Sequence, residues 1–104
     1  MSHVTLALIG AGDRGFAYGK YALDHPDEVR FVAVADPIAV RRDRFATAQG
    51  IAAENRFADW CDLLGGPRLA DAVIVATPDR LHVPPAAAAP SAGYHLLLET
   101  PQAT

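Results

Sequence analysis

The chain has 104 residues, of which 51% are hydrophobic and 20% are charged, a composition typical of one globular domain rather than of a disordered segment. Its formal net charge of −3, with Arg41, Arg42 and Arg44 as the only basic cluster, argues against binding to nucleic acid or to an anionic membrane surface. No apolar run approaches the roughly 20 residues of a membrane-spanning helix.

Short apolar runs recur along the chain and predict β-strands at residues 4–9, 31–35, 72–76 and 95–98. The runs are nearly continuous and do not alternate with polar residues, which is typical of parallel strands covered on both faces. A weaker strand is expected around residues 55–57.

Stretches of helical character lie between these strands. The first two cover residues 13–24 and 38–49, the second closed by Gly50 as a C-cap. A short third helix should begin after Asp59 as N-cap and end at residues 65–66, and Pro90 predicts that a fourth is short or kinked. This order predicts one domain over residues 1–104, a doubly wound α/β fold of the Rossmann type with a parallel sheet in strand order 3-2-1-4-5.

A glycine-rich motif, GAGDRG, follows the first predicted strand directly and opens the first helix. In this GxGxxG spacing, Gly10 permits a tight turn, Gly12 lets the backbone approach a pyrophosphate, and Gly15 lets the helix pack close to the strand. The helix N-terminus adds N–H groups and a positive dipole end. The motif predicts a dinucleotide-binding loop made of Gly10, Ala11, Gly12, Asp13, Arg14 and Gly15.

Asp36 stands at the end of the second predicted strand, 21 residues after Gly15. A carboxylate there would accept hydrogen bonds from the adenosine ribose hydroxyls and repel a 2′-phosphate, so NAD is predicted as the cofactor and NADP is less favoured. In the alternative interpretation, Asp36 only starts a turn with Pro37. Arg41 and Arg42 would either weaken the preference for NAD or form the solvated face of the following helix.

With these motifs in place, the sequence resembles the N-terminal NAD(P)-binding domain of the glucose-fructose oxidoreductase and inositol dehydrogenase (Gfo/Idh/MocA) family. The resemblance covers essentially the whole chain and also rests on FADWCDLL, DAVIVATPDRLH and AGYHLLLETP. It implies that Thr77, Pro78 and His82 line the nicotinamide side of the site, and that Glu99 lies near the nicotinamide ribose. In the alternative interpretations, His82 is only a residue at the start of a helix without a partner, and Glu99 is only a solvated carboxylate at the end of a strand.

Two departures from the family pattern bear on catalysis. Thr100 stands where the family has the lysine of its Glu-Lys-Pro motif, and threonine supplies neither a cation nor a proton donor at neutral pH. The family's C-terminal α/β domain, which carries the substrate pocket, is absent from these 104 residues. We therefore expect an NAD(P)-binding domain of an oxidoreductase acting on a sugar or polyol that does not catalyse alone, and we predict no catalytic residue.

Other site types find little support in the sequence. The four histidines lack metal-ligand spacing, so no metal site is predicted, and Cys61 beside Trp60 is expected to pack in the core. A single cysteine excludes an internal disulfide and, with no basic, cleavable leader at the start, favours the cytoplasm. The last strand, residues 94–98, would be an open apolar edge. It predicts a homodimer formed by strand pairing, and a non-enzymatic assembly module is the alternative function.

Overall fold

The computed structural model describes residues 4–66, 68–76 and 95–98. The elements in chain order are β1 (Val4–Ile9), α1 (Asp13–Asp24), β2 (Val29–Ala35), α2 (Ala39–Gln49), the 3₁₀ turn η1 (Ala53–Asn55), β3 (Arg56–Phe57), α3 (Trp60–Gly65), β4 (Ala72–Val75) and β5 (His95–Leu98). This order confirms the predicted alternation of strands and helices. The expected fourth helix, with Pro90, lies outside the described residues.

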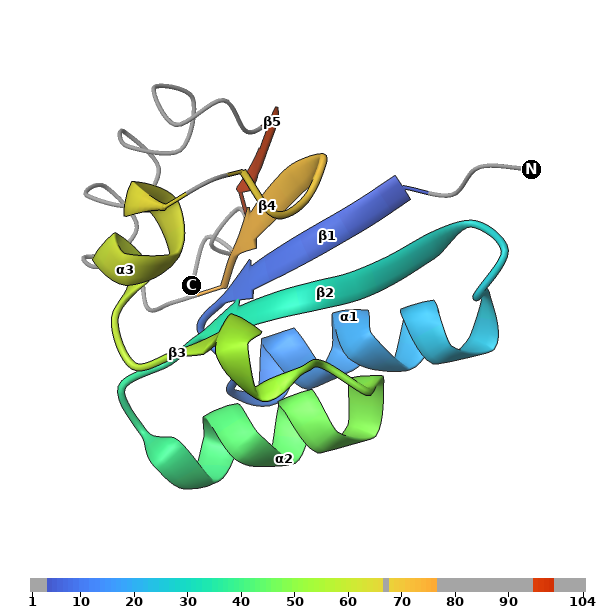
Figure 1. Cartoon of the computed structure of the whole chain (residues 1–104). Helices are drawn as coiled ribbons and strands as arrows, with labels where there is room; N and C mark the ends of the chain where they lie inside the picture. The colour runs from blue at the N-terminus through green and yellow to red at the C-terminus, as the bar shows by residue number, and fades with distance from the viewer. Residues whose placement is uncertain (1–3, 67, 77–94, 99–104) are drawn as a thin grey trace, which may run out of the picture.

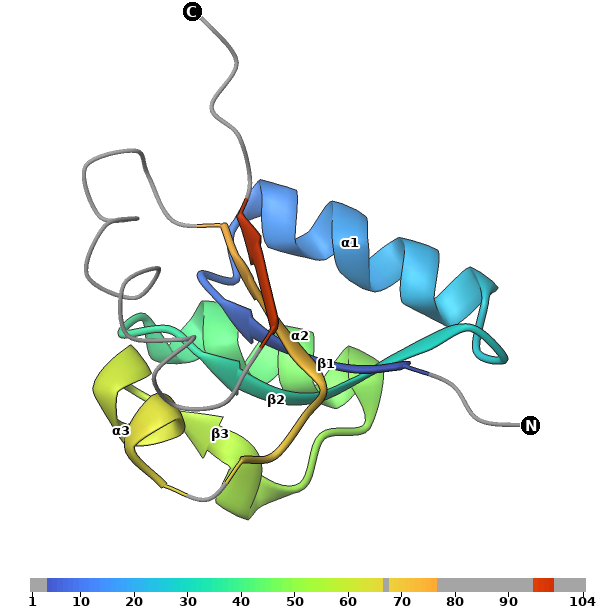
Figure 2. The same ribbon diagram turned by 90° about the horizontal axis from the view of Figure 1, so that it is seen from above.

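The five strands form one parallel sheet in the order β3-β2-β1-β4-β5, which confirms the predicted Rossmann-type topology. Helices α1 and α2 cover one face of the sheet and α3 covers the other (Figure 1). β5 lies beside β4 at one end of the sheet (Figure 2). The carboxyl ends of all five strands therefore meet at one edge.

Each face of the sheet has its own apolar core. On the α1 and α2 side, the fully buried ring of Phe45 makes edge-to-face contacts with Phe16 and Phe31, at centroid distances of 5.6 and 5.2 Å. On the α3 side, small strand residues pack against Leu63 and Leu64. Burial on both faces explains why the strand sequences are continuous apolar runs.

β2 is longer than predicted and contains one extra residue. It begins at Val29 because Val29 and Arg30 pair with the first two residues of β1, although Arg30 interrupts the apolar pattern. Leu6 pairs with Phe31 and Ala7 with Ala33, so the register shifts at Val32. Val32 and Ala33 both pack on the α3 side of the sheet, which is the behaviour of a β-bulge.

The predicted helix ends at Gly50 and Asp59 are confirmed. Gly50 follows α2 in the left-handed conformation, with φ 72°, and Asp59 Oδ1 accepts a hydrogen bond from the Cys61 backbone N at 2.9 Å. The expectation that Cys61 packs in the core is wrong, since its side chain is exposed. Leu63 and Leu64 take the inner side of this short helix, and Trp60 is half-buried against the same core.

A polar clamp joins the starts of β1 and β4. Asp71 Oδ2 accepts hydrogen bonds from the Thr5 backbone N at 3.0 Å and from Thr5 Oγ1 at 3.2 Å, and the Asp71 backbone N donates to Thr5 Oγ1 at 3.0 Å. The clamp lies at the amino ends of the strands, away from the glycine-rich motif. Within the described ranges, no helix has the length and apolar character needed to cross a membrane.

Candidate functional site

The glycine-rich motif forms the connection between β1 and α1 at the carboxyl edge of the sheet. Gly10 has φ 95°, a conformation that residues with a Cβ rarely adopt, and its backbone N donates to Ala35 O at 2.9 Å. Gly12 is the N-cap of α1 and supplies no side-chain acceptor to the first helical N–H groups, which have no partner within the helix itself. The tight turn predicted at Gly10 is confirmed.

Gly15 and Gly12 lack side chains for different reasons. A Cβ on Gly15 would lie 2.6 Å from Gly10 O and 2.8 Å from Leu8 Cδ2, so the close packing of α1 on β1 requires glycine there. A Cβ on Gly12 would have Arg41 Nη1 as its nearest neighbour at 3.7 Å, an ordinary contact. The packing of the chain itself does not require glycine at position 12. A ligand that approaches the loop backbone closely would require it.

Asp36 follows β2 and joins the two loops at this edge of the sheet. The residue is buried, with 4% of its surface exposed. Oδ2 accepts a hydrogen bond from the Ala11 backbone N at 2.7 Å, and Oδ1 accepts one from the Ile38 backbone N at 2.7 Å. The bond to Ile38 is the turn that the alternative interpretation predicted. The bond to Ala11 spans 25 residues of sequence and fixes the glycine loop against the end of β2.

A carboxylate has about four lone-pair sites, and two of those on Asp36 are used by these backbone groups. No other hydrogen bond to this carboxylate is present among the described residues, so its remaining acceptor sites are not used by the chain itself. The residues present therefore suit a dinucleotide: an open loop at Gly12, a helix N-terminus without a side-chain cap, and an acid beside them.

The three arginines of α2 have different surroundings. Arg42 Nη1 donates to Asp36 O at 3.0 Å and its side chain is only 19% exposed, so its assignment to a solvated helix face is wrong. Arg44 lies over the ring of Phe16, 4.7 Å from the centroid. Arg41 is exposed, as expected, but it extends towards Gly12. Sequence alone could not show this approach, because it depends on how α2 sits beside the glycine loop.

Several of the predicted site residues fall where the structure describes little or nothing. Asp13 and Arg14 are the first two residues of α1, and their side chains are outside the description. Thr77, Pro78, His82 and Glu99 lie outside the described residues altogether. Ala76 marks the edge that they follow, since its backbone N donates to Ile9 O at 2.8 Å, where β1 passes into the glycine loop.

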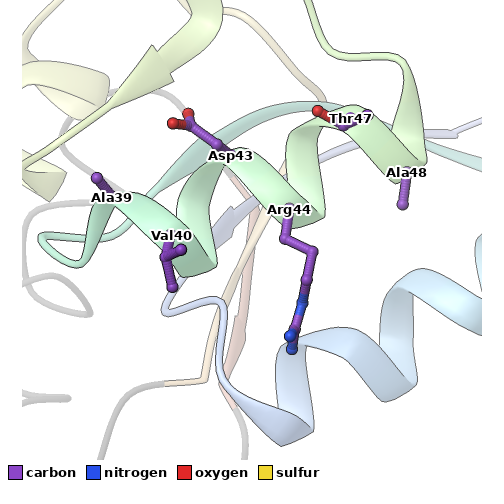
Figure 3. Close-up of a pocket in the computed structure, with 6 residues that line it drawn as sticks. All are labelled: Ala39, Val40, Asp43, Arg44, Thr47 and Ala48. Carbon is purple, nitrogen blue, oxygen red and sulfur yellow. The ribbon is translucent and has the colours of Figure 1, made fainter.

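A separate shallow hollow of about 640 Å³ lies along the outer side of α2 (Figure 3). It is lined by Ala39, Val40, Asp43, Arg44, Thr47 and Ala48. All six come from one helix, and none belongs to the glycine loop. In the part of the chain that the structure describes, no group of three or more His, Cys, Asp or Glu residues could hold a metal ion. The glycine loop with Asp36 is thus the candidate site.

Residues 4–104 match the family model GFO_IDH_MocA, described as "Oxidoreductase family, NAD-binding Rossmann fold". None of the curated protein sequences matches the chain. Among solved structures, the WlbA dehydrogenase from Bordetella pertussis, in complex with NADH and UDP-GlcNAcA, is 25% identical with a TM-score of 0.84, covering 95% of this chain and 30% of that one.

Two further structures are similar. A putative myo-inositol dehydrogenase from Sinorhizobium meliloti is 28% identical with a TM-score of 0.79, covering 94% of this chain and 28% of its own. A variant of a 3-ketoreductase from Actinomadura kijaniata, in complex with TDP-benzene and NADP, is 27% identical with a TM-score of 0.80, covering 96% and 31%. The chain thus spans less than a third of the length of these proteins.

Proposed function

Because the chain belongs to the Gfo/Idh/MocA oxidoreductase family and matches its NAD-binding Rossmann domain, we propose that it is the cofactor half of a sugar or polyol dehydrogenase. Similar proteins include one crystallised with NADH and a nucleotide sugar and one named as a putative inositol dehydrogenase. The chain spans about 30% of such proteins, so the proposal for these 104 residues is limited to the cofactor and names no substrate-binding residue.

The observation that carries the proposal is the geometry of the glycine loop. The loop is held in place by the 2.7 Å bond from the Ala11 backbone N to Asp36, it leads into the uncapped N-terminus of α1, and it has room at Gly12. The N–H groups of the first turn of α1 would bind the pyrophosphate, and Asp36 would accept a hydrogen bond from the adenosine ribose. Bound NAD supplies the hydride chemistry, and the chain binds and orients it.

The assignment of residues to the nicotinamide side of the site rests on the family resemblance. Thr77, Pro78, His82 and Glu99 are proposed to line it, since they follow β4 and β5, whose carboxyl ends share the edge of the glycine loop. Thr100 replaces the motif lysine and cannot transfer a proton at neutral pH. We therefore propose that this chain binds the cofactor without reducing or oxidising a substrate alone.

Titration of the 104-residue chain with NADH tests the proposal. NADH at 100 times its Kd should stabilise the folded state by about 2.7 kcal/mol, which corresponds to a rise in Tm of roughly 10–20 °C for a domain of this size. No change in Tm at millimolar NADH would refute cofactor binding. Turnover of NAD by the chain alone with inositols or nucleotide sugars would refute the proposed lack of catalysis.

An assembly role is the second candidate. β5 is the terminal strand of the described sheet and pairs there only with β4, and an open strand edge can pair with another chain. We propose that two copies dimerise through this edge. Light scattering should then show the mass rising with concentration, and a constant monomer mass would count against pairing. The cytoplasm remains the proposed compartment, on the strength of the single cysteine.

A further inference from the structure

Asp36 stands at the point where the sheet stops supporting the chain. Its backbone N donates to Phe57 O at 3.0 Å, which continues the pairing of β2 with β3. Beyond this bond the chain turns away towards α2. A group that binds a ligand keeps its geometry only when the residues that support it are themselves fixed. The turn that carries the Asp36 carboxylate therefore needs an anchor of its own.

Arg42 anchors this turn from two directions. Its backbone N donates to Ile38 O at 3.0 Å, and its side chain folds back six residues, so that Nη1 donates to Asp36 O at 3.0 Å. In the described part of the chain, no other group donates to Asp36 O. The arginine thus holds the peptide group that carries the acid.

The ion pair of Arg42 does not account for the position of its side chain. Asp43 Oδ1 lies 3.8 Å from Arg42 Nε, but the Asp43 side chain is more than half exposed, and an exposed pair at that distance adds little stability. The arginine side chain is nevertheless largely buried, and burying a charged group is costly unless it is hydrogen-bonded. The bond to Asp36 O is the contact that offsets this cost.

We propose that Arg42 is a positioning residue for the cofactor. By holding Asp36 O, it directs the Asp36 carboxylate at the adenosine ribose without touching the cofactor itself. The inference rests on the proposed dinucleotide site. Arg42 then controls how strongly the ribose hydroxyl contributes to binding.

The test measures the contribution of the adenosine 2′-hydroxyl. Fluorescence titration of the 104-residue chain gives the Kd of NADH and the Kd of NADH that lacks this hydroxyl, and the ratio of the second to the first is the readout. A hydrogen bond to a charged acceptor should make this ratio about 10 or more in the wild-type chain. In Arg42→Met, which keeps the apolar stem and removes the donors, the ratio should fall below about 3. Arg42→Lys retains a donor for Asp36 O and should keep the ratio above about 5.

Arg56→Met is the matched control. Arg56 Nε and Nη2 donate to Ile51 O at 3.0 and 2.8 Å, and Nη1 lies 3.9 Å from Asp43 Oδ1. Arg56 thus makes the same kinds of contact as Arg42, from a side chain of similar burial, but its side chain makes none of them with Asp36. Arg56→Met should lower the Tm about as much as Arg42→Met and leave the Kd ratio at its wild-type value.

Three outcomes would overturn the role of Arg42. If Arg42→Met lowers the Tm but keeps the wild-type ratio, the arginine only stabilises the fold. If Arg56→Met loses the ratio as well, the loss follows from general destabilisation. If Arg42→Lys loses the ratio as fully as Arg42→Met does, a donor to Asp36 O is not what directs the acid.

Two outcomes concern the proposed function beneath the inference. If removal of the hydroxyl leaves the wild-type Kd unchanged, the ribose does not bind to Asp36, and the inference is refuted while cofactor binding stands. If NADH itself does not bind to the wild-type chain, the proposed function fails.

Discussion

Alanine substitutions at Gly12 and Gly15 should separate cofactor binding from folding. A Cβ on Gly15 would lie 2.6 Å from a backbone carbonyl oxygen and 2.8 Å from a buried leucine methyl. Relieving such overlap costs about 1–3 kcal/mol, which exceeds the gain of up to about 1 kcal/mol from replacing glycine in a helix. Gly15→Ala should therefore lower the Tm by roughly 5–15 °C.

Gly12→Ala should behave in the opposite way. The new methyl group meets nothing closer than 3.7 Å, and the φ of −83° is open to alanine. The loss of a glycine N-cap should change the free energy of unfolding by about 1 kcal/mol or less. The same methyl group occupies the space that a pyrophosphate needs. The affinity for NADH should therefore fall at least about tenfold, which is a loss of about 1.4 kcal/mol or more of binding free energy.

Thermal unfolding without ligand and NADH titration, applied to both variants, make the comparison. Gly65→Ala is the matched control: a Cβ there has nothing within 4 Å, so the substitution should leave NADH affinity unchanged and should not lower the Tm, since alanine in the last turn of α3 gains at most about 1 kcal/mol. The reasoning is refuted if Gly12→Ala destabilises the fold as much as Gly15→Ala, or if it leaves NADH affinity unchanged.

Three further predictions concern the hydrogen bonds of the fold. Asp36→Ala leaves two backbone N–H groups unpaired and should lower the free energy of unfolding in urea by about 2–3 kcal/mol, with weaker NADH binding; unchanged stability would refute the role of the carboxylate as a tether. Thr5→Val removes the two clamp hydrogen bonds of Thr5 Oγ1 and keeps the one from the Thr5 backbone N; it should cost about 1 kcal/mol at constant NADH affinity, so a loss of affinity would show that the two edges of the sheet are coupled. The hydrogen bond from Tyr21 to Glu28 raises the pKa of Tyr21 above 10.0. The contribution of this hydrogen bond to the free energy of unfolding is complete below pH 10 and is lost as the pH rises through the folded-state pKa. Glu28→Gln should lower this pKa in a tyrosinate absorbance titration, with Tyr21→Phe as the reference, and an unchanged titration would contradict the assignment.

Most of the fold could be predicted because its signals are local. Gly10 and Gly15 act within the β1–α1 connection, and their spacing alone indicates the turn and the close packing that the structure shows. Gly50 and Asp59 are recognisable as caps for the same reason, since each acts on its own helix. Continuous apolar runs then give a parallel sheet, because each strand is covered on both faces.

The features that sequence missed depend on segments far apart in the chain. The bond from the Ala11 backbone to Asp36 joins residues 25 positions apart, and the approach of Arg41 to Gly12 depends on where α2 lies beside α1. Cys61 was misplaced for a different reason. A helix of six residues is too short for its apolar pattern to show which side faces the sheet, and the adjacent Leu63 and Leu64 occupy that side.

The extra residue in β2 also affects how length may vary in such sequences. Without Val32, the remaining residues of β2 would pair one-to-one with β1, because Phe31 and Ala33 already face consecutive residues of that strand. Asp36 would keep its place opposite the glycine loop. Chains in which the acid stands either 20 or 21 positions after the last glycine can therefore present the same site, and a search pattern with one fixed interval would overlook one of these two groups. The natural place for that insertion or deletion is the middle of a buried strand, not a surface loop.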